Sequence, residues 1–141
     1  GLAIYNFLTS HKATVNTSVM GVAASAASII LMAGDTITMP EDSFLMIHEP
    51  WTVIVGDASE MREMADFLDK LSGTLVSIYS KNTGLEESEI KQMLSEETWL
   101  NGTEAKEKGF ATVVTNQKVA ALSKEWAKNF KTTPYYCNKL S

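Results

Sequence analysis

Short apolar stretches alternate with amphipathic ones along most of the chain. Residues 1–13 carry apolar positions on one helical face with no capping residue before them, which is typical of the middle of a helix. Residues 15–20 alternate as a short strand, Gly21 interrupts it, and the small residues that follow predict a tightly packed helix at about 25–32. The first unit is therefore predicted to be a strand, a turn and a buried helix.

The rest of the chain continues the alternation of strands and helices. The pattern predicts strands at 36–39, 44–48, 51–56 and 110–114. It predicts shorter helices at 86–94, about 103–109 and 118–130. Because strands and helices alternate throughout, the sequence indicates the α/β class.

One helix, at about 58–82, is much longer than the others. Asp57, followed three residues later by Glu60, forms the pattern of a capping box at its start. Its apolar positions recur at spacings of three and four and form one seam: Met61, Met64, Leu68, Leu71, Leu75 and Ile78. Such a seam either faces the protein's own core or packs against another subunit, and the pattern leaves both interpretations open.

Composition narrows the classes of protein. The 141 residues are 45% apolar and 21% charged, with a net charge of −5 and no block of Lys and Arg, so a nucleic-acid surface has little support. The longest apolar run, at 29–33, is far shorter than the roughly 20 residues that span a bilayer. The single cysteine, Cys137, excludes an internal disulfide framework and suits a reducing compartment. We therefore expect a cytoplasmic protein that does not bind nucleic acid or membranes.

The residues that could carry chemistry are few. Ser25 follows a strand and a glycine turn and begins a helix, where the free N–H of Ala26 and the helix dipole favour a developing oxyanion. Of the two histidines, His11 lies in a polar stretch, whereas His48 ends an apolar strand and is the better candidate for a base. Taken alone, a serine in an alanine-rich helix and a histidine at a strand end more often have packing or hydrogen-bonding roles than catalytic ones. Ser28 lies on nearly the same helical face as Ser25, where a small side chain permits close packing, and receives no catalytic role.

Three motifs, in this order, carry a family resemblance: "SVMGVAASAASIILMAG", "MPEDSFLMIHEP" and "EETWLNGTEAKEKGF". Together they resemble the blocks around the serine, histidine and acid of the ClpP endopeptidase family, closest in style to ClpP-like proteases of phages and prophages. The resemblance covers about residues 1–114. It implies that Ser25 is the nucleophile and His48 the base. The acidic member of the triad corresponds to Glu97, where the family's main branch has aspartate, and Glu96 is the second candidate for this role.

The resemblance also implies a fold, a substrate and an assembly. The fold is a crotonase-type spiral of repeated β-β-α units, and the activity is that of a serine endopeptidase with no metal or cofactor. A substrate polypeptide is expected to bind as a strand beside "WTVIVGDA", so Trp51, Thr52 and Val53 would contact it. The long helix resembles the family's handle between two stacked rings of identical subunits. The implied partners are an ATP-driven unfoldase or, in the phage branch, capsid and scaffold proteins.

Two further expectations concern the extent of the chain and its activity. The resemblance implies a protease domain at 1–116 that lacks the family's N-terminal strands and its second oxyanion donor, a glycine upstream of Gly1. A C-terminal helix and tail would occupy 117–141. The alternatives are a catalytically silent, ring-forming structural module of the same fold, and a crotonase-fold enzyme acting on acyl-coenzyme A.

Overall fold

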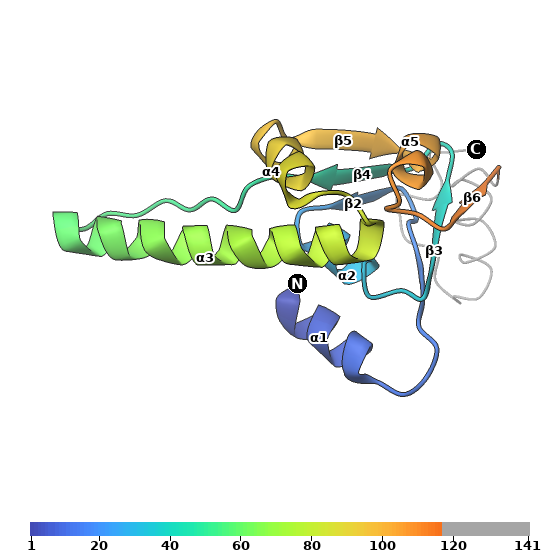
Figure 1. Ribbon diagram of the computed structural model, residues 1–141, viewed down its shortest axis with the longest axis horizontal. Helices are drawn as coiled ribbons and strands as arrows, with labels where there is room; N and C mark the ends of the chain where they lie inside the picture. Colours follow the sequence, from blue (N-terminus) through green and yellow to red (C-terminus); the bar gives the residue numbers. More distant parts are fainter. Residues whose placement is uncertain (117–141) are drawn as a thin grey trace, which may run out of the picture.

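A computed structural model describes residues 1–116 of the chain. The predicted C-terminal helix at 118–130, the tail and Cys137 lie outside the described residues. The described elements are, in order, α1 (Leu2–Ser10), β1 (Asn16–Ser18), β2 (Val22–Ala24), α2 (Ala26–Leu31), β3 (Thr36–Pro40), β4 (Phe44–Ile47), α3 (Ala58–Thr83), α4 (Glu87–Ser95), β5 (Thr98–Asn101), α5 (Gly102–Glu107) and β6 (Val113–Thr115). The chain is thus α/β, as predicted (Figure 1).

The strands form two small sheets. In the first, β3 lies between β1 and β6 and pairs in parallel with both. In the second, β4 lies between β2, which is parallel to it, and β5, which is antiparallel. The order strand, strand, helix occurs twice, as β1-β2-α2 and β3-β4-α3, and corresponding strands of the two units pair with each other. This arrangement agrees with the expected repeated β-β-α fold.

The core lies where the two sheets meet the helices. In β4, Leu45 and Ile47 are fully buried, whereas Phe44 and Met46 on the opposite face are exposed or half-buried. Burying such a side chain contributes about 1.5 to 3 kcal/mol, so β4 is fixed in position and in register by its inner face. The aromatic rings of Tyr79 and Phe110, both buried, contact each other with their centroids 5.8 Å apart.

Helix α3 begins and ends as its sequence predicts. The Asp57 side chain accepts hydrogen bonds from the N–H groups of Ser59 and Glu60, and the Glu60 side chain accepts one from the Asp57 N–H, which completes the capping box. Gly84 ends the helix with a φ of +79°, a conformation that suits glycine. Among residues 1–116, no helix, α3 included, has both the length and the apolar character to cross a membrane.

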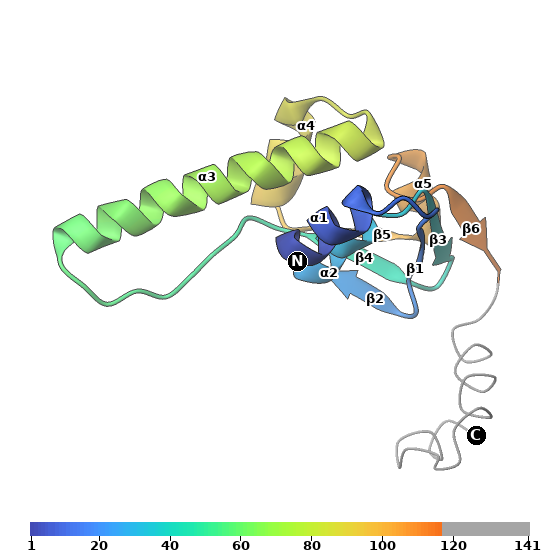
Figure 2. The same cartoon turned by 90° about the horizontal axis from the view of Figure 1, so that it is seen from below.

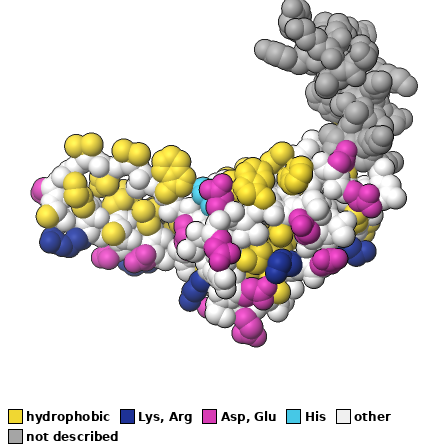
Figure 3. Space-filling model, turned by 90° about the horizontal axis from the view of Figure 1, so that it is seen from above, with side chains coloured by type: hydrophobic (Ala, Val, Ile, Leu, Met, Phe, Trp, Pro, Cys, Tyr) yellow, Lys and Arg dark blue, Asp and Glu magenta, His cyan; other side chains and the backbone are white. Residues whose placement is uncertain are grey.

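The apolar seam of α3 is divided along the helix. Its C-terminal part packs into the core, where Leu75 and Ile78 are buried. Its N-terminal part projects from the rest of the protein as an arm, and segment 51–56 leads outward from β4 toward the free end of that arm (Figures 1 and 2). On this arm Met61 is 48% exposed and Phe67 is 57% exposed. The core interpretation therefore holds for the C-terminal end of the seam, whereas the arm exposes apolar side chains, which Figure 3 shows along its surface.

Four local features differ from the predictions. The strand predicted at 110–114 begins later, since β6 spans Val113–Thr115. The predicted strand at 51–56 is wrong for the isolated chain: these residues are extended, but no strand within residues 1–116 pairs with them. Two strands were not predicted. The small residues of β2 do not form an apolar alternation, and β5 follows directly after α4 in a polar sequence. Both strands form because each of them pairs with β4. This pairing joins segments that are far apart in the sequence, so the local pattern of residues does not reveal it.

Candidate active site

Ser25 lies at the sharp turn between β2 and α2. It is exposed and has a φ of +55° and a ψ of −120°, which is unfavourable for a residue with a side chain by about 1 to 3 kcal/mol. The Ser25 N–H donates a hydrogen bond to the Met46 carbonyl at 3.0 Å, which continues the pairing of β2 with β4 beyond Ala24. This pairing holds the strained turn and leaves the Ser25 hydroxyl pointing away from the sheet.

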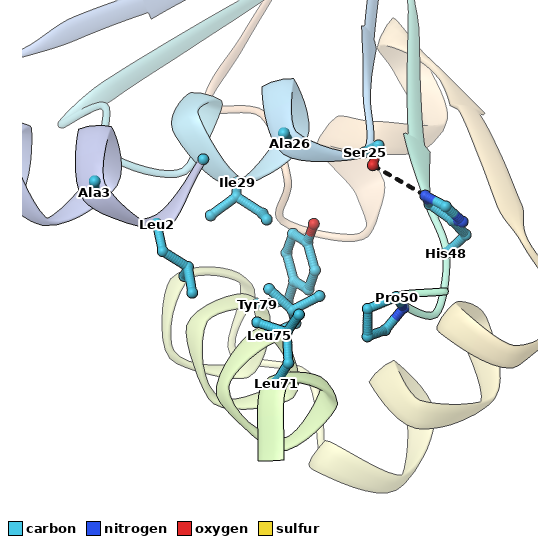
Figure 4. A pocket seen from close by; sticks show the side chains of 11 residues that line it. Leu2, Ala3, Ser25, Ala26, Ile29, His48, Pro50, Leu71, Leu75 and Tyr79 are labelled. Atoms are coloured by element: carbon cyan, nitrogen blue, oxygen red, sulfur yellow. Dashed lines mark hydrogen bonds between the residues drawn. The ribbon is translucent and has the colours of Figure 1, made fainter. Parts of the chain in front are cut away.

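His48 is the residue that the structure brings to Ser25. The parallel register of β2 and β4 places Ala24 beside Met46, so the residues that follow both strands lie at the same edge of the sheet. There the Ser25 Oγ and the His48 Nε2 are 3.0 Å apart (Figure 4). His11 lies at the end of α1, where its Nδ1 accepts a hydrogen bond from the Ala13 N–H. Of the two histidines, His48 alone contacts Ser25.

Neither candidate acid is hydrogen bonded to His48 among the described residues. The Glu97 Oε1 accepts a hydrogen bond from the Trp99 indole at 3.3 Å, and the Glu96 Oε1 accepts one from the Gln92 side chain at 2.9 Å. Both glutamates are exposed. The pairing of β4 with β5 nevertheless distinguishes them, because its last pair is Ile47 with Thr98. His48 and Glu97 are the residues next to that pair, whereas Glu96 lies one residue further away.

An apolar cavity of about 390 Å³ opens beside the Ser25–His48 pair. Figure 4 shows that one wall comes from α3, where Leu71, Leu75 and Tyr79 follow one another at intervals of four residues. Ile29 of α2 and Pro50 close other sides. A side chain entering the cavity would lie next to the Ser25 hydroxyl, and the lining favours an apolar side chain.

Beneath Ser25, two buried hydroxyls form a connection that sequence analysis missed. The Ser28 Oγ donates to the Ser25 carbonyl at 2.5 Å and lies 2.7 Å from the Tyr79 hydroxyl. Burial raises the pKa of Tyr79 to about 12, against a smaller lowering by its hydrogen bond with Ser28, so the phenol stays protonated at physiological pH. Sequence analysis gave Ser28 no role and did not single out Tyr79. The spacing of Tyr79 after Leu71 and Leu75 was the one available signal.

The predicted peptide-binding residues stand outside this cavity. Trp51 is 73% exposed and Val53 is 82% exposed, and Thr52 between them is exposed as well. Pro50, directly before them, lines the cavity. Residues 51–53 are thus available to an extended peptide that leads away from Ser25, and their role stays a prediction. Within residues 1–116, no group of three or more potential ligand side chains could hold a metal ion.

The geometry defines a class of chemistry. An exposed serine hydroxyl within hydrogen-bond distance of an imidazole is the arrangement with which serine hydrolases form a covalent acyl intermediate. At the first position of α2, the Ala26 N–H has no partner within the helix and can donate to a developing oxyanion.

Comparison with known proteins gives the family. The sequence model of the family described as Clp protease matches residues 1–118, and the chain belongs to this family. It is 33% identical over 121 residues to the ATP-dependent Clp protease proteolytic subunit 2 of Treponema denticola, a match that covers 84% of the chain and 60% of the relative.

Two other relatives give the same result. The ATP-dependent Clp protease proteolytic subunit of Chlorella vulgaris is 32% identical over 92% of the chain and 62% of its own length. The corresponding subunit of Deinococcus radiodurans is 33% identical over 83% of the chain and 58% of its own length. The chain thus spans about three-fifths of the length of these curated relatives.

Proposed function

We propose that this protein is a serine endopeptidase in which Ser25 attacks the substrate carbonyl and His48 transfers the proton. The observation that carries the proposal is the 3.0 Å contact between the Ser25 Oγ and the His48 Nε2 at a strained, exposed turn. The Oγ would form an ester with the acyl part of the substrate while His48 takes its proton and passes it to the leaving amine. A water molecule, deprotonated by His48, would then hydrolyse the ester and restore the serine.

We propose Glu97, rather than Glu96, as the acid that orients His48. The proposal rests on the end of the pairing between β4 and β5: Ile47 and Thr98 form its last pair, His48 directly follows Ile47, and Glu97 directly precedes Thr98. Glu97 lies in a turn with a φ of +53°, directly before β5, and in this proposal its side chain rotates away from Trp99 and directs its carboxylate toward His48. Glu96 lies one residue further from this pair, at the end of α4.

The substrate is proposed to be a polypeptide with an apolar residue before the cleaved bond. The cavity beside Ser25 is large enough for a leucine-sized or phenylalanine-sized side chain, and its wall of Leu71 and Leu75 favours such a group. Main-chain hydrogen bonds to the extended, unpaired residues Trp51, Thr52 and Val53 would hold the rest of the peptide as an added strand.

The proposed partners follow from the arm and from the relatives. Exposed apolar side chains on α3 and on segment 51–56 favour association with further copies of this chain, as in stacked rings. The relatives are proteolytic subunits of ATP-dependent proteases, which supports an ATP-driven partner that supplies unfolded polypeptides. Maturation of phage capsid or scaffold proteins, the other task that the motifs suggest, has no support in these relatives' names.

The central test is covalent labelling of Ser25 by a fluorophosphonate, located by mass spectrometry of the modified peptide. We expect one adduct, on Ser25, because only a hydroxyl deprotonated by a neighbouring base reacts at a useful rate. Ser25→Ala abolishes it, and His48→Ala slows it by about a thousandfold or more. Cleavage of an unfolded polypeptide by the same sample distinguishes a peptidase from other hydrolases.

His11→Ala is the matched control, since it removes the other histidine and leaves the Ser25–His48 contact intact. A folded protein without an adduct would favour the silent structural module. Unlabelled Ser25 together with hydrolysis of an acyl-coenzyme A thioester would favour the other crotonase-fold activity.

Glutamine substitutions separate the two candidate acids. We expect Glu97→Gln to lower kcat/KM for peptide hydrolysis by about a hundredfold or more, because the amide no longer fixes the reactive imidazole tautomer or balances the imidazolium charge. Glu96→Gln removes a neighbouring charge of the same type and should leave kcat/KM within about twofold of wild type. Equal losses in both variants, or a loss in Glu96→Gln alone, would contradict the assignment.

The association proposal is tested by sedimentation velocity. Phe67→Glu places a charge on the exposed apolar part of α3 and should weaken the assembly at least about tenfold, since burying an unpaired charge is costly. Thr74→Glu adds the same charge at an exposed polar position of α3 and should not change the particle size. A wild-type protein that sediments as a monomer at tens of micromolar would exclude association through this arm.

A further inference from the structure

The chain of hydrogen bonds from Tyr79 through Ser28 to Ser25 has a fixed direction. A serine hydroxyl has one proton, and Ser28 uses it to donate to the Ser25 carbonyl at 2.5 Å. The 2.7 Å contact between Ser28 and Tyr79 must then use the Tyr79 proton, so the phenol donates to the Ser28 Oγ. Ser28 and Tyr79 are 0% and 1% exposed, which leaves no water to compete with either bond.

These bonds act on the peptide unit that joins Ser25 to Ala26. The Ser25 carbonyl accepts from both the N–H and the Oγ of Ser28. A peptide unit is planar, and in its trans form the N–H points opposite to the carbonyl oxygen. Whatever fixes the Ser25 carbonyl therefore also fixes the direction of the Ala26 N–H. Hydrogen bonds accepted by the carbonyl also polarise the peptide unit, which makes its N–H a stronger donor.

We propose that Ser28 and Tyr79 are positioning residues that direct and polarise the Ala26 N–H as the oxyanion donor. The inference rests on the proposed function, because it assigns a purpose to a peptide unit only if Ser25 is the nucleophile. The carbonyl side of the unit accepts the two bonds from Ser28, and both residues that the unit joins, Ser25 and Ala26, line the cavity in which the oxyanion would form (Figure 4).

Tyr79 is well placed to serve as the fixed end of this connection. It belongs to the part of α3 that is packed in the core, and its ring contacts Phe110. The same ring lines the cavity. The hydroxyl is therefore held by long-range packing, 51 residues away in sequence from Ser28, and does not depend on the local conformation of the strained turn.

The test compares Ser28→Ala, Tyr79→Phe and the double variant by the rate of fluorophosphonate labelling of Ser25 and by kcat and KM for a peptide ester. We expect Ser28→Ala to lower the labelling rate and kcat by about 10- to 100-fold, less than deletion of an oxyanion donor would. Tyr79→Phe should lower both by about 3- to 10-fold. KM should change by less than about twofold, because the donor acts on the transition state rather than on the bound substrate.

The double variant separates positioning from folding. Tyr79 acts through Ser28, so the double variant should be no slower than Ser28→Ala alone. Its thermal stability should nevertheless exceed that of Ser28→Ala, because that single variant leaves the buried Tyr79 hydroxyl without an acceptor. If Ser28 and Tyr79 acted only in folding, the labelling rate would rise and fall with thermal stability. The double variant would then be labelled faster than Ser28→Ala. That recovery would overturn the inference.

Tyr5→Phe is the matched control. Tyr5 is also a buried tyrosine whose hydroxyl forms one hydrogen bond, with the Asn82 side chain, but it has no recorded bond to the turn at Ser25. Its labelling rate should equal that of wild type. An unlabelled wild-type protein would overturn the proposed function and this inference together, whereas labelled wild type with unchanged rates in all three variants would overturn this inference alone.

Discussion

The candidate site depends on the parallel pairing of β2 with β4. This pairing places Ala24 beside Met46 and extends by the hydrogen bond from the Ser25 N–H to the Met46 carbonyl. Without it, Ser25 would have no reason to adopt its positive φ, and His48, two residues beyond Met46, would not reach the serine hydroxyl. Because the inner face of β4 is fully buried at Leu45 and Ile47, the register that aligns the two side chains is set by the core.

Conformational strain in the described residues lies at the same edge of the sheet. Ser25 and Glu97 are the two non-glycine residues with positive φ among residues 1–116, and they flank β4 on either side, after β2 and before β5. Each costs about 1 to 3 kcal/mol, which the buried strands between them offset. Strained backbone conformations of this kind are typical of functional sites, where the surrounding structure holds a side chain in a position that its own backbone does not favour. The buried Tyr79–Ser28 pair supports the first of these turns from below.

Much of this arrangement could be predicted from the sequence, for identifiable reasons. The capping box of α3 and the first residues of β3 and β4 rest on local signals, and the structure agrees with each. The preference for His48 over His11 also rests on a local signal, and His48 is the histidine that lies beside Ser25. Strand β2, the unpaired state of 51–56 and the Ser28–Tyr79 contact depend on partners far away in sequence, so no local pattern could reveal them. Glu97 is an intermediate case: the motif proposed it, its position directly before β5 supports it, and its carboxylate contacts Trp99.

The most direct test of the account is a crystal structure of the protein with a peptide boronate that carries an apolar residue next to boron. The account predicts boron bonded to the Ser25 Oγ, the apolar side chain in the cavity lined by Leu71 and Leu75, and one boronate oxygen within hydrogen-bond distance of the Ala26 nitrogen. It also predicts the Glu97 carboxylate at the His48 Nδ1. A boronate bound to another residue, or bound to Ser25 with its oxygens turned away from Ala26, would contradict the account.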